Sequence, residues 1–181
     1  MVRTIVADPP WRPKLHANTV GRREGPYRAG PQRYYELMSV EEISALASWV
    51  KTHSQERSHL YLWVLNQHVD WGYEVARSWG FEPQQMLTWR KTTNGGEAIL
   101  GTGRFQANTE QVLVCRRGGP VGNAFGFTRG TCFDAPRGRH SEKPDRLFEI
   151  VEGASPGPYL EMFARRPRSG WRVWGREVDP L

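Results

Sequence analysis

The sequence predicts an α/β protein with a mostly parallel sheet flanked by helices, in one domain over residues 1–181. Three observations lead to this prediction. Short apolar segments rich in Val, Leu and Trp alternate with segments whose apolar residues recur at helical spacing. The first apolar segment stops at Asp-Pro-Pro-Trp, and open α/β sheets bind ligands where their strands end. The length of 181 residues also matches about one domain of ordinary size.

Each element can be placed from its local pattern. Ser39 and Glu42 form a capping box, which marks the start of a helix. Gly80 suits the left-handed position that follows many helices, and Pro144 suits the first position of another. Three helices are therefore expected over about residues 39–51, 67–79 and 144–152. Strands are expected over residues 3–7, 59–65, 84–90, 110–116, 159–164 and 171–174.

Three segments without periodicity are expected to be basic substrate loops, at about residues 12–35, 91–109 and 116–140. The chain has a net charge of +6, with 21 arginines and four lysines. Guanidinium groups pair bidentately with phosphates and with guanine edges, so this composition favours a polyanionic partner. Codon bias in a GC-rich genome would produce the same excess of arginine, and both interpretations stay open.

The composition argues against several classes of protein. No run of eighteen apolar residues is present, so no membrane span is expected, and the apolar N-terminal stretch is too short for a signal peptide. Cys115 and Cys132 cannot form a disulfide framework or a zinc site by themselves, and the five histidines lack metal-ligand spacing. We therefore expect a cytoplasmic protein with no metal and no membrane association.

Asp8-Pro9-Pro10-Trp11 is the strongest local signal for chemistry. Two consecutive prolines fix the backbone and remove two N–H donors, which leaves carbonyls that only accept hydrogen bonds. An acidic side chain beside such a backbone suits an exocyclic amine with two N–H groups, and Trp11 offers a flat surface for the ring that carries the amine. The alternative is a rigid turn that ends the strand, with Trp11 in the core.

This tetrapeptide resembles the catalytic tetrapeptide of the MT-A70 family of S-adenosylmethionine-dependent N6-adenine methyltransferases, in its compact bacterial and phage form. Three further segments match the family in the same order: residues 103–113, residues 140–144 (HSEKP) and residues 159–175. The resemblance implies a Rossmann-like methyltransferase fold with a permuted motif order. The catalytic motif comes first in the chain, and the strand that lines the cofactor comes last.

The resemblance also implies a role for individual residues, with S-adenosylmethionine as the cofactor. Asp8 and the Pro9 carbonyl would accept hydrogen bonds from the target amine, and Trp11 would stack on the base. The cofactor would be bound by Asp8, Lys143, Glu161, Phe163, Arg165, Gly175 and Arg176. Contacts to the substrate are expected from Trp11, Tyr27, Tyr35, Arg22, Arg23, Arg104, Arg129, Arg137 and His140.

Several of these positions have a structural alternative. Lys143 would otherwise be a solvated lysine near a helix start, where a cation is mildly unfavourable. Glu161 either meets a polar partner such as ribose hydroxyls or faces outward from its strand. Phe163 either packs on the cofactor's adenine or belongs to the core. Arg166 and Arg168 are expected to be solvated.

The sequence departs from the family pattern at two places. Where the family usually has His-Asn, this chain has Pro167 and Arg168, and where the family has Asn-Gln after a glycine, it has Arg176 and Glu177. Only seven residues precede Asp8, so the wall for the cofactor's adenine that an upstream segment supplies in larger members must come from elsewhere.

The expected function is methylation of the N6 amine of adenine in DNA, in a bacterial or phage-infected cell. A duplex target would have its base flipped out of the stack, at a cost of a few kcal/mol. Three alternatives stay open: the same reaction on RNA, a nucleic-acid-binding partner subunit of a methyltransferase, and methylation of an amine or amide on protein. One domain of this size covers little duplex, so a homodimer or a partner subunit is also compatible with the sequence.

Overall fold

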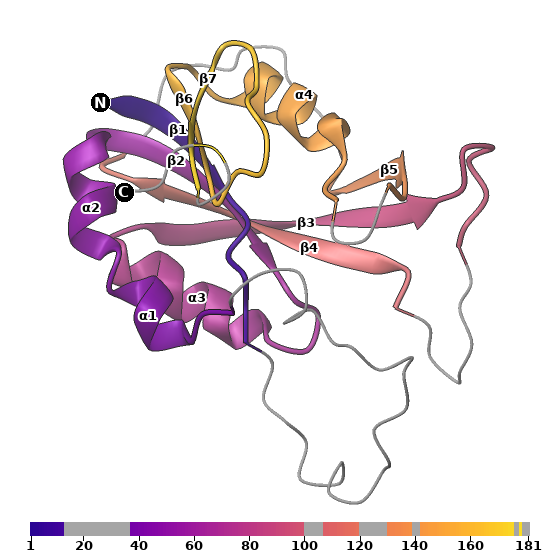
Figure 1. Ribbon diagram of the computed structural model, residues 1–181, viewed down its shortest axis with the longest axis horizontal. Helices are drawn as coiled ribbons and strands as arrows, with labels where there is room; N and C mark the ends of the chain where they lie inside the picture. The colour runs from indigo at the N-terminus through magenta and orange to yellow at the C-terminus, as the bar shows by residue number, and fades with distance from the viewer. Residues whose placement is uncertain (13–36, 100–106, 120–129, 139–141, 176–177, 179–181) are drawn as a thin grey trace, which may run out of the picture.

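A computed structural model describes residues 1–12, 37–99, 107–119, 130–138, 142–175 and 178. Its core is one sheet of seven strands in the order β5-β3-β4-β2-β1-β6-β7 (Figure 1). The elements in chain order are β1 (Val2–Ala7), α1 (Val40–Ser44), α2 (Ala47–His53), β2 (Ser54–Val64), α3 (Val69–Ser78), β3 (Glu82–Thr92), β4 (Thr109–Arg117), β5 (Cys132–Pro136), α4 (Asp145–Ala154), β6 (Tyr159–Met162) and β7 (Trp171–Trp174).

The sheet is mostly parallel, as the sequence predicts, with one reversed strand. β1 lies parallel to β2 and to β6, β6 is parallel to β7, and β3 is parallel to β5. β4 is antiparallel to both of its neighbours, β2 and β3. Because β4 is reversed, it begins at the same edge of the sheet at which β1 and β2 end, and this edge carries the site described below.

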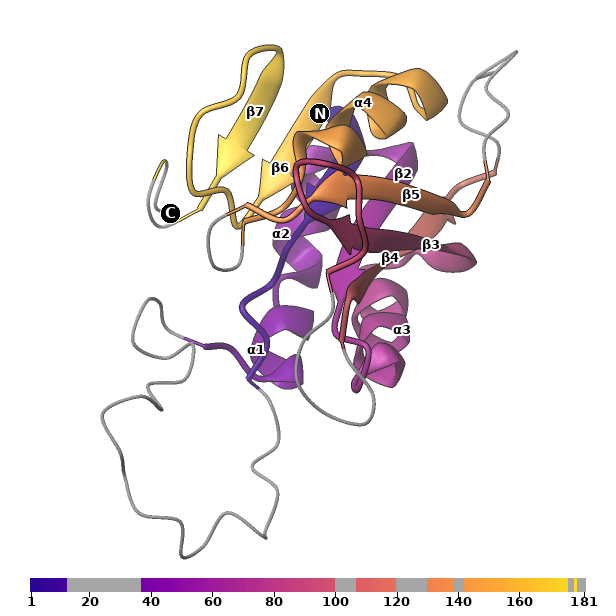
Figure 2. The ribbon, with the colours of Figure 1, turned by 90° about the vertical axis from the view of Figure 1, so that its right-hand side faces the viewer.

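Helices cover both faces of the sheet: α1, α2 and α3 lie on one side and α4 on the other (Figures 1 and 2). β1 shows how the chain supplies both cores. Ile5 and Ala7 pack in the cluster under α1–α3, whereas Val6 packs in the cluster under α4. Both faces of β1 are therefore buried, which explains why it reads as a continuous apolar run rather than as an alternating pattern.

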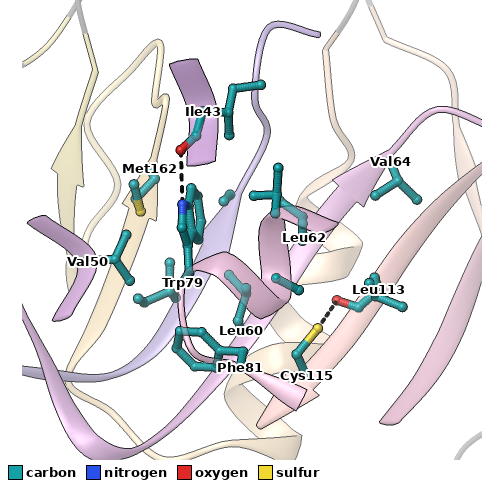
Figure 3. Close-up of a cluster of buried hydrophobic side chains, with 14 of the residues drawn as sticks. Ile43, Val50, Leu60, Leu62, Val64, Trp79, Phe81, Leu113, Cys115 and Met162 are labelled. Carbon is teal, nitrogen blue, oxygen red and sulfur yellow. Dashed lines mark hydrogen bonds between the residues drawn. The ribbon is translucent and has the colours of Figure 1, made fainter. Parts of the chain in front are cut away.

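The helix expected over residues 39–51 is in fact two helices, α1 and α2. The capping box of Ser39 and Glu42 is present. The helix is interrupted after one turn because the Ile43 carbonyl accepts the N–H of Leu46 at 3.1 Å and the buried indole Nε1 of Trp79 at 3.0 Å (Figure 3). In a continuous helix that carbonyl would accept the N–H four residues ahead. A tertiary contact thus decides where the helix breaks.

Two other expectations about the elements are wrong. The segment 116–140 was expected to be a loop, but it contains β5, a short edge strand beside β3. Side chains hold it there, because Trp89 Nε1 donates to the Ala135 carbonyl at 2.9 Å and Arg90 pairs with Asp134. Pro144 is the N-cap of α4 and has extended backbone, so the helix begins one residue later than expected.

The bounds of three strands also differ from those expected. β2 begins at Ser54 rather than at residue 59, and β3 continues to Thr92, into the segment expected as a loop. β6 ends at Met162 because Phe163 adopts a φ of 62°, which no extended strand accommodates. None of the helices in the described part of the chain is long and apolar enough to cross a membrane.

Candidate active site

A cavity of about 490 Å³ lies where β1 and β6 end, and its size is within the usual range for small-molecule sites. Five of the residues expected to bind the cofactor line it: Asp8, Lys143, Glu161, Phe163 and Arg165. The other lining residues are Val6, Trp63, Glu142, Phe148, Arg166 and Arg168. The tertiary structure therefore brings together residues from the first, third and fourth of the sequence segments noted above.

The Asp8-Pro9-Pro10-Trp11 turn is rigid and hydrogen-bonded. The Pro9 carbonyl accepts the N–H of Trp11 at 2.8 Å, and the Pro10 carbonyl accepts the N–H of Met38 at 2.8 Å. A short parallel bridge between Trp11 and Met38 closes the turn. Each carbonyl oxygen has a second lone pair, so the expected role of the Pro9 carbonyl toward an amine stays a prediction.

Trp11 lies in the core beneath this turn. Its side chain is 6% exposed, its Nε1 donates to the Trp63 carbonyl at 3.0 Å, and its ring lies 6.3 Å from that of Trp71. This is the placement that the structural alternative describes. Stacking of Trp11 on a base stays a prediction, and in this conformation the ring offers little surface for it.

Asp8 belongs to a row of four ion-paired side chains that alternate in charge, which we call the Lys143 cluster: Asp8, Lys143, Glu110 and Lys91. Lys143 Nζ lies 3.0 Å from Asp8 Oδ1 and 3.3 Å from Glu110 Oε2, and Lys91 Nζ lies 2.7 Å from Glu110 Oε1. The two ammonium groups also lie over aromatic rings, Lys143 over Trp63 and Lys91 over Trp89. All four charged side chains are between 17% and 26% exposed, so water screens their interactions only in part.

The environment shifts the pKa values of this cluster in different directions. Burial raises the pKa of Asp8, and the Lys143 ammonium opposes that shift. Burial would also raise the pKa of Glu110, but Lys143 and Lys91 together lower it. Desolvation alone would lower the pKa of Lys143, yet the carboxylates of Asp8 and Glu110 raise it. Lys143 is therefore a firmly charged ammonium that keeps two partly buried carboxylates in place.

A second chain of charges also borders the cavity, and we call it the Arg168 cluster. Arg168 Nε lies 3.3 Å from Glu161 Oε2, and its Nη2 lies 2.9 Å from Asp145 Oδ1. Arg166 Nη2 contacts the same Asp145 oxygen at 2.9 Å, and its Nη1 is 3.9 Å from Glu142. The members of the cluster are Glu161, Arg168, Asp145, Arg166 and Glu142.

The expectation that Arg168 is solvated is wrong. Its side chain is 18% exposed, and its guanidinium carbon lies 3.4 Å from the centre of the Phe148 ring. The connection between β6 and β7 passes over the start of α4, so Arg168 meets Asp145 and Phe148 there. Arg166 is 55% exposed, as expected for a largely solvated side chain, although it is ion-paired. Glu161 has the polar partner that its position requires, and burial raises its pKa while Arg168 opposes the shift.

Phe163 and Gly175 shape the end of β6. Phe163 has a left-handed backbone, lines the cavity and packs edge-on against Trp174, with ring centres 5.2 Å apart. A Cβ on Gly175 would lie 2.3 Å from the Ala164 carbonyl oxygen, so only glycine allows this close approach. Gly175 is not among the residues that line the cavity, and its expected contact with the cofactor stays a prediction.

The structure does not test the other expected residues. Arg137 is exposed, its backbone N–H donates to the Thr92 carbonyl, and it does not line the cavity. Within the described ranges, no three His, Cys, Asp or Glu side chains form a group that could hold a metal ion. The residues that lie outside the described part of the chain are Tyr27, Tyr35, Arg22, Arg23, Arg104, Arg129, His140 and Arg176.

Sequence reasoning did not single out Glu110, Lys91 or Arg168. Glu110 lies near the start of β4 and reaches the site because β4 runs against its neighbours, whereas Lys91 lies near the end of β3, which runs in the same direction as β2 and ends at the same edge. The available signal was an acidic residue, Glu110, at the start of a buried strand within the second matching segment. Arg168 had no such signal, because its partners lie on two other elements, Glu161 on β6 and Asp145 on α4.

Comparison with known proteins identifies the family of this chain. Residues 2–177 match the MT-A70 family model. The chain is 30% identical to the human N(6)-adenosine-methyltransferase catalytic subunit METTL3, over 98% of this chain and 28% of that protein. It is 31% identical to the N6-methyladenosine RNA methyltransferase MTA1 of Cryphonectria parasitica, over 96% of this chain and 51% of that protein. It is 25% identical to the type II methyltransferase M.MunI of a Mycoplasma species, over 97% of this chain and 77% of that protein.

The chain thus spans little more than a quarter of the human protein and about half of the fungal one. The sheet of seven strands, mostly parallel and flanked by helices, is consistent with a Rossmann-like methyltransferase fold. The resemblance drawn from the sequence motifs is confirmed by the family match over nearly the whole chain. This protein belongs to the MT-A70 family of N6-adenine methyltransferases, whose members use S-adenosylmethionine as the methyl donor.

Proposed function

We propose that this protein transfers a methyl group from S-adenosylmethionine to the exocyclic N6 amine of adenine in DNA. The observation that carries the proposal is the position of Asp8. Its carboxylate follows β1 on a rigid turn, is paired with Lys143 at 3.0 Å, and lines a cavity of about 490 Å³. An acceptor fixed in this way suits an amine that must be oriented for attack.

The residues that line the cavity fit the proposed cofactor. S-Adenosylmethionine presents a cationic sulfur, a carboxylate, ribose hydroxyls and a flat base. Asp8 and Glu161 supply carboxylates for the cationic sulfur and the hydroxyls, Lys143 and Arg165 supply cations for the carboxylate, and Phe163 supplies a ring face. When bound there, the cofactor supplies an electrophilic methyl group on positively charged sulfur.

The main task of the protein is to make a poor nucleophile attack. The lone pair of the adenine amine is delocalised into the ring, and a hydrogen bond from this amine to Asp8 favours the pyramidal nitrogen of the transition state. The nitrogen would gain the methyl group as the bond between that methyl group and sulfur breaks, which leaves neutral S-adenosylhomocysteine, and it would pass one proton to solvent. The Asp8 carboxylate stabilises the positive charge that develops on the nitrogen. Lys143 holds Asp8 in one orientation, so little reorganisation is needed when the reaction occurs.

DNA is the polymer that we favour. The excess of arginine and the net charge of +6 suit a polyanion. The motifs resemble those of compact bacterial and phage members, and the alignment covers 77% of the Mycoplasma type II methyltransferase. We accordingly propose a cytoplasmic enzyme of a bacterial or phage-infected cell, acting as a homodimer or with a partner subunit.

RNA is the second candidate, because the Cryphonectria relative is named as an RNA methyltransferase and aligns over 96% of this chain. A binding subunit without catalytic activity is the third. These three candidates share the cavity; the first two differ in the polymer that is methylated, and the third binds nucleic acid without modifying it.

The test is transfer of radiolabelled methyl groups to duplex DNA, single-stranded DNA and RNA of matched sequence, followed by digestion and identification of the labelled nucleoside. Asp8→Asn is the matched control, because it keeps the shape of the side chain and removes its charge. Labelled N6-methyladenine from DNA, absent with Asp8→Asn, is the expected result. Label from RNA alone would make RNA the substrate in place of DNA. No label despite cofactor binding would favour the binding subunit.

A further inference from the structure

We propose that Arg168 is a positioning residue of the cofactor pocket, which fixes the Glu161 carboxylate at the cavity wall and anchors it to the start of α4. Glu161 is thereby held ready to accept hydrogen bonds from the hydroxyl groups of a ligand. This inference rests on the proposed function, because it concerns how the same cavity takes S-adenosylmethionine.

The contacts of Arg168 fix its guanidinium in one orientation. Nε meets Glu161 Oε2 at 3.3 Å, Nη2 meets Asp145 Oδ1 at 2.9 Å, and the planar group lies 3.4 Å from the centre of the Phe148 ring. A planar cation held at two edges and on one face has little freedom to rotate. Arg168 and Glu161 are 18% and 19% exposed, so this pair is only weakly screened by water.

Glu161 needs such a partner because of where β6 places it. It lies within the sheet, opposite Val6 of β1 and Val173 of β7, and an isolated carboxylate there is costly. The charged groups that face it are Arg168 and Arg166, which attract it, and Asp8, which repels it. Its ion pair uses Oε2, and the carboxylate carries a second oxygen with lone pairs of its own.

Asp145 connects this pair to the rest of the fold. It is the first residue of α4, where a negative charge is favoured by the helix dipole, and its Oδ1 accepts from both Arg168 and Arg166. Ion pairs from Arg166 and Arg168 to Asp145 thus hold the connection between β6 and β7 against α4. Arg168 stands at one of the positions where this chain departs from the usual family sequence, so the arrangement belongs to this chain's own residues.

The experiment measures binding of S-adenosylhomocysteine by calorimetry between pH 5 and pH 8. The variants are Arg168→Met, which keeps the length of the stem and removes the charge, and Arg168→Lys, which keeps the charge and removes the planar fork. Arg172→Met is the control, because Arg172 is an exposed residue on β7 and does not line the cavity.

We expect Arg168→Met to bind about tenfold more weakly at pH 8, the size of effect expected from losing one charge-assisted contact. The loss should grow as the pH falls, because burial raises the pKa of Glu161 and the cation that opposes this shift is gone. Adding Glu161→Gln to Arg168→Met should remove this pH dependence. Arg168→Lys should keep the wild-type pH dependence and bind several-fold more weakly, because a point charge cannot hold both carboxylates.

The outcomes separate this inference from the proposed function. Wild-type protein that binds neither S-adenosylhomocysteine nor S-adenosylmethionine would overturn the proposed function itself. Wild-type binding with unchanged affinity and pH profile in Arg168→Met would overturn the role of Arg168 alone. If circular dichroism shows that Arg168→Met is unfolded, Arg168→Lys decides the question, and its binding with wild-type affinity would overturn the inference.

Discussion

The two charge clusters that border the cavity differ in how far they extend into water. Every charged side chain of the Lys143 cluster is at most 26% exposed. The Arg168 cluster begins with side chains that are 18% and 19% exposed, continues through Asp145 and Arg166, which are more than half exposed, and ends at Glu142, which is 42% exposed. The Lys143 cluster lies across the ends of the strands, and the Arg168 cluster connects the loop between β6 and β7 to α4 at the surface.

This difference suggests a division of labour between the clusters. Charges that are shielded from water interact strongly, so the Lys143 cluster can hold Asp8 in one state and one orientation for chemistry. In the Arg168 cluster only the Glu161–Arg168 pair is shielded, while Asp145 and Arg166 extend into water, so this cluster is suited to holding one carboxylate at the wall of a binding site. We expect changes in the first cluster to lower turnover more than affinity for the cofactor, and changes in the second cluster to lower mainly that affinity.

Replacement of Asp8 should give the largest effect and provides the sharpest test of this division. We expect Asp8→Asn to lower kcat at least about a hundredfold, because the acceptor charge at the reacting nitrogen is lost. Affinity for S-adenosylmethionine should stay within about tenfold of wild type. The measurement is single-turnover methyl transfer together with calorimetric binding. A large loss of affinity with an unchanged kcat would show that Asp8 acts in cofactor binding, and would contradict the division of roles between the Lys143 and Arg168 clusters.

Removing the central cation tests whether the Lys143 cluster acts as a unit. Lys143→Met leaves Asp8 and Glu110 without the ammonium between them, and we expect a loss of about 2–3 kcal/mol in the free energy of unfolding. Without the ammonium, the pKa of Asp8, already raised by burial, should rise further. The acidic limb of the pH profile of kcat/KM should then move to higher pH. Lys143→Arg keeps the charge and should show a smaller shift, and an unmoved limb in Lys143→Met would argue against coupling.

Gly175→Ala tests whether the close packing of Gly175 against Ala164 is needed for cofactor binding. The added Cβ would lie 2.3 Å from the Ala164 carbonyl oxygen, so the backbone must shift at a cost of about 1–3 kcal/mol. The expected result is a lower Tm with weaker cofactor binding. Gly130→Ala is the matched control, because a Cβ there meets nothing within 4 Å. Equal Tm values for the two variants would show that the close approach is not required.

Glu110→Gln should give the smallest of these effects, and its pH dependence reveals the cause. The folded pKa of Glu110 lies below its ordinary value, so its ionised form stabilises the fold above the ordinary pKa of about 4.3. That contribution is lost as the pH falls through the folded pKa. We expect a deficit of about 1–2 kcal/mol at pH 7 that shrinks toward pH 3, measured by urea unfolding. A deficit that is constant with pH would indicate lost packing instead.

Much of the fold could be predicted from local patterns, and the exceptions have tertiary causes. The strand before Asp8 and the capping box at Ser39 were readable because neighbouring residues create those signals. The break between α1 and α2 was not, because it depends on an indole that lies 36 residues further along the chain. β5 was missed because a short edge strand with Asp and Pro has no strong pattern, and side chains of β3 hold it in place.

The candidate site divides in the same way. The sequence by itself determined that Asp8 ends a strand on a rigid turn, and that Lys143 and Glu161 lie in segments that match one family. Only the tertiary structure decided what these residues contact. Glu110 reaches Lys143 because β4 is reversed, and Arg168 reaches Asp145 because its loop crosses the start of α4. Local chemistry is encoded in neighbouring residues, whereas electrostatic partners depend on which strands and loops the fold brings within a few ångströms.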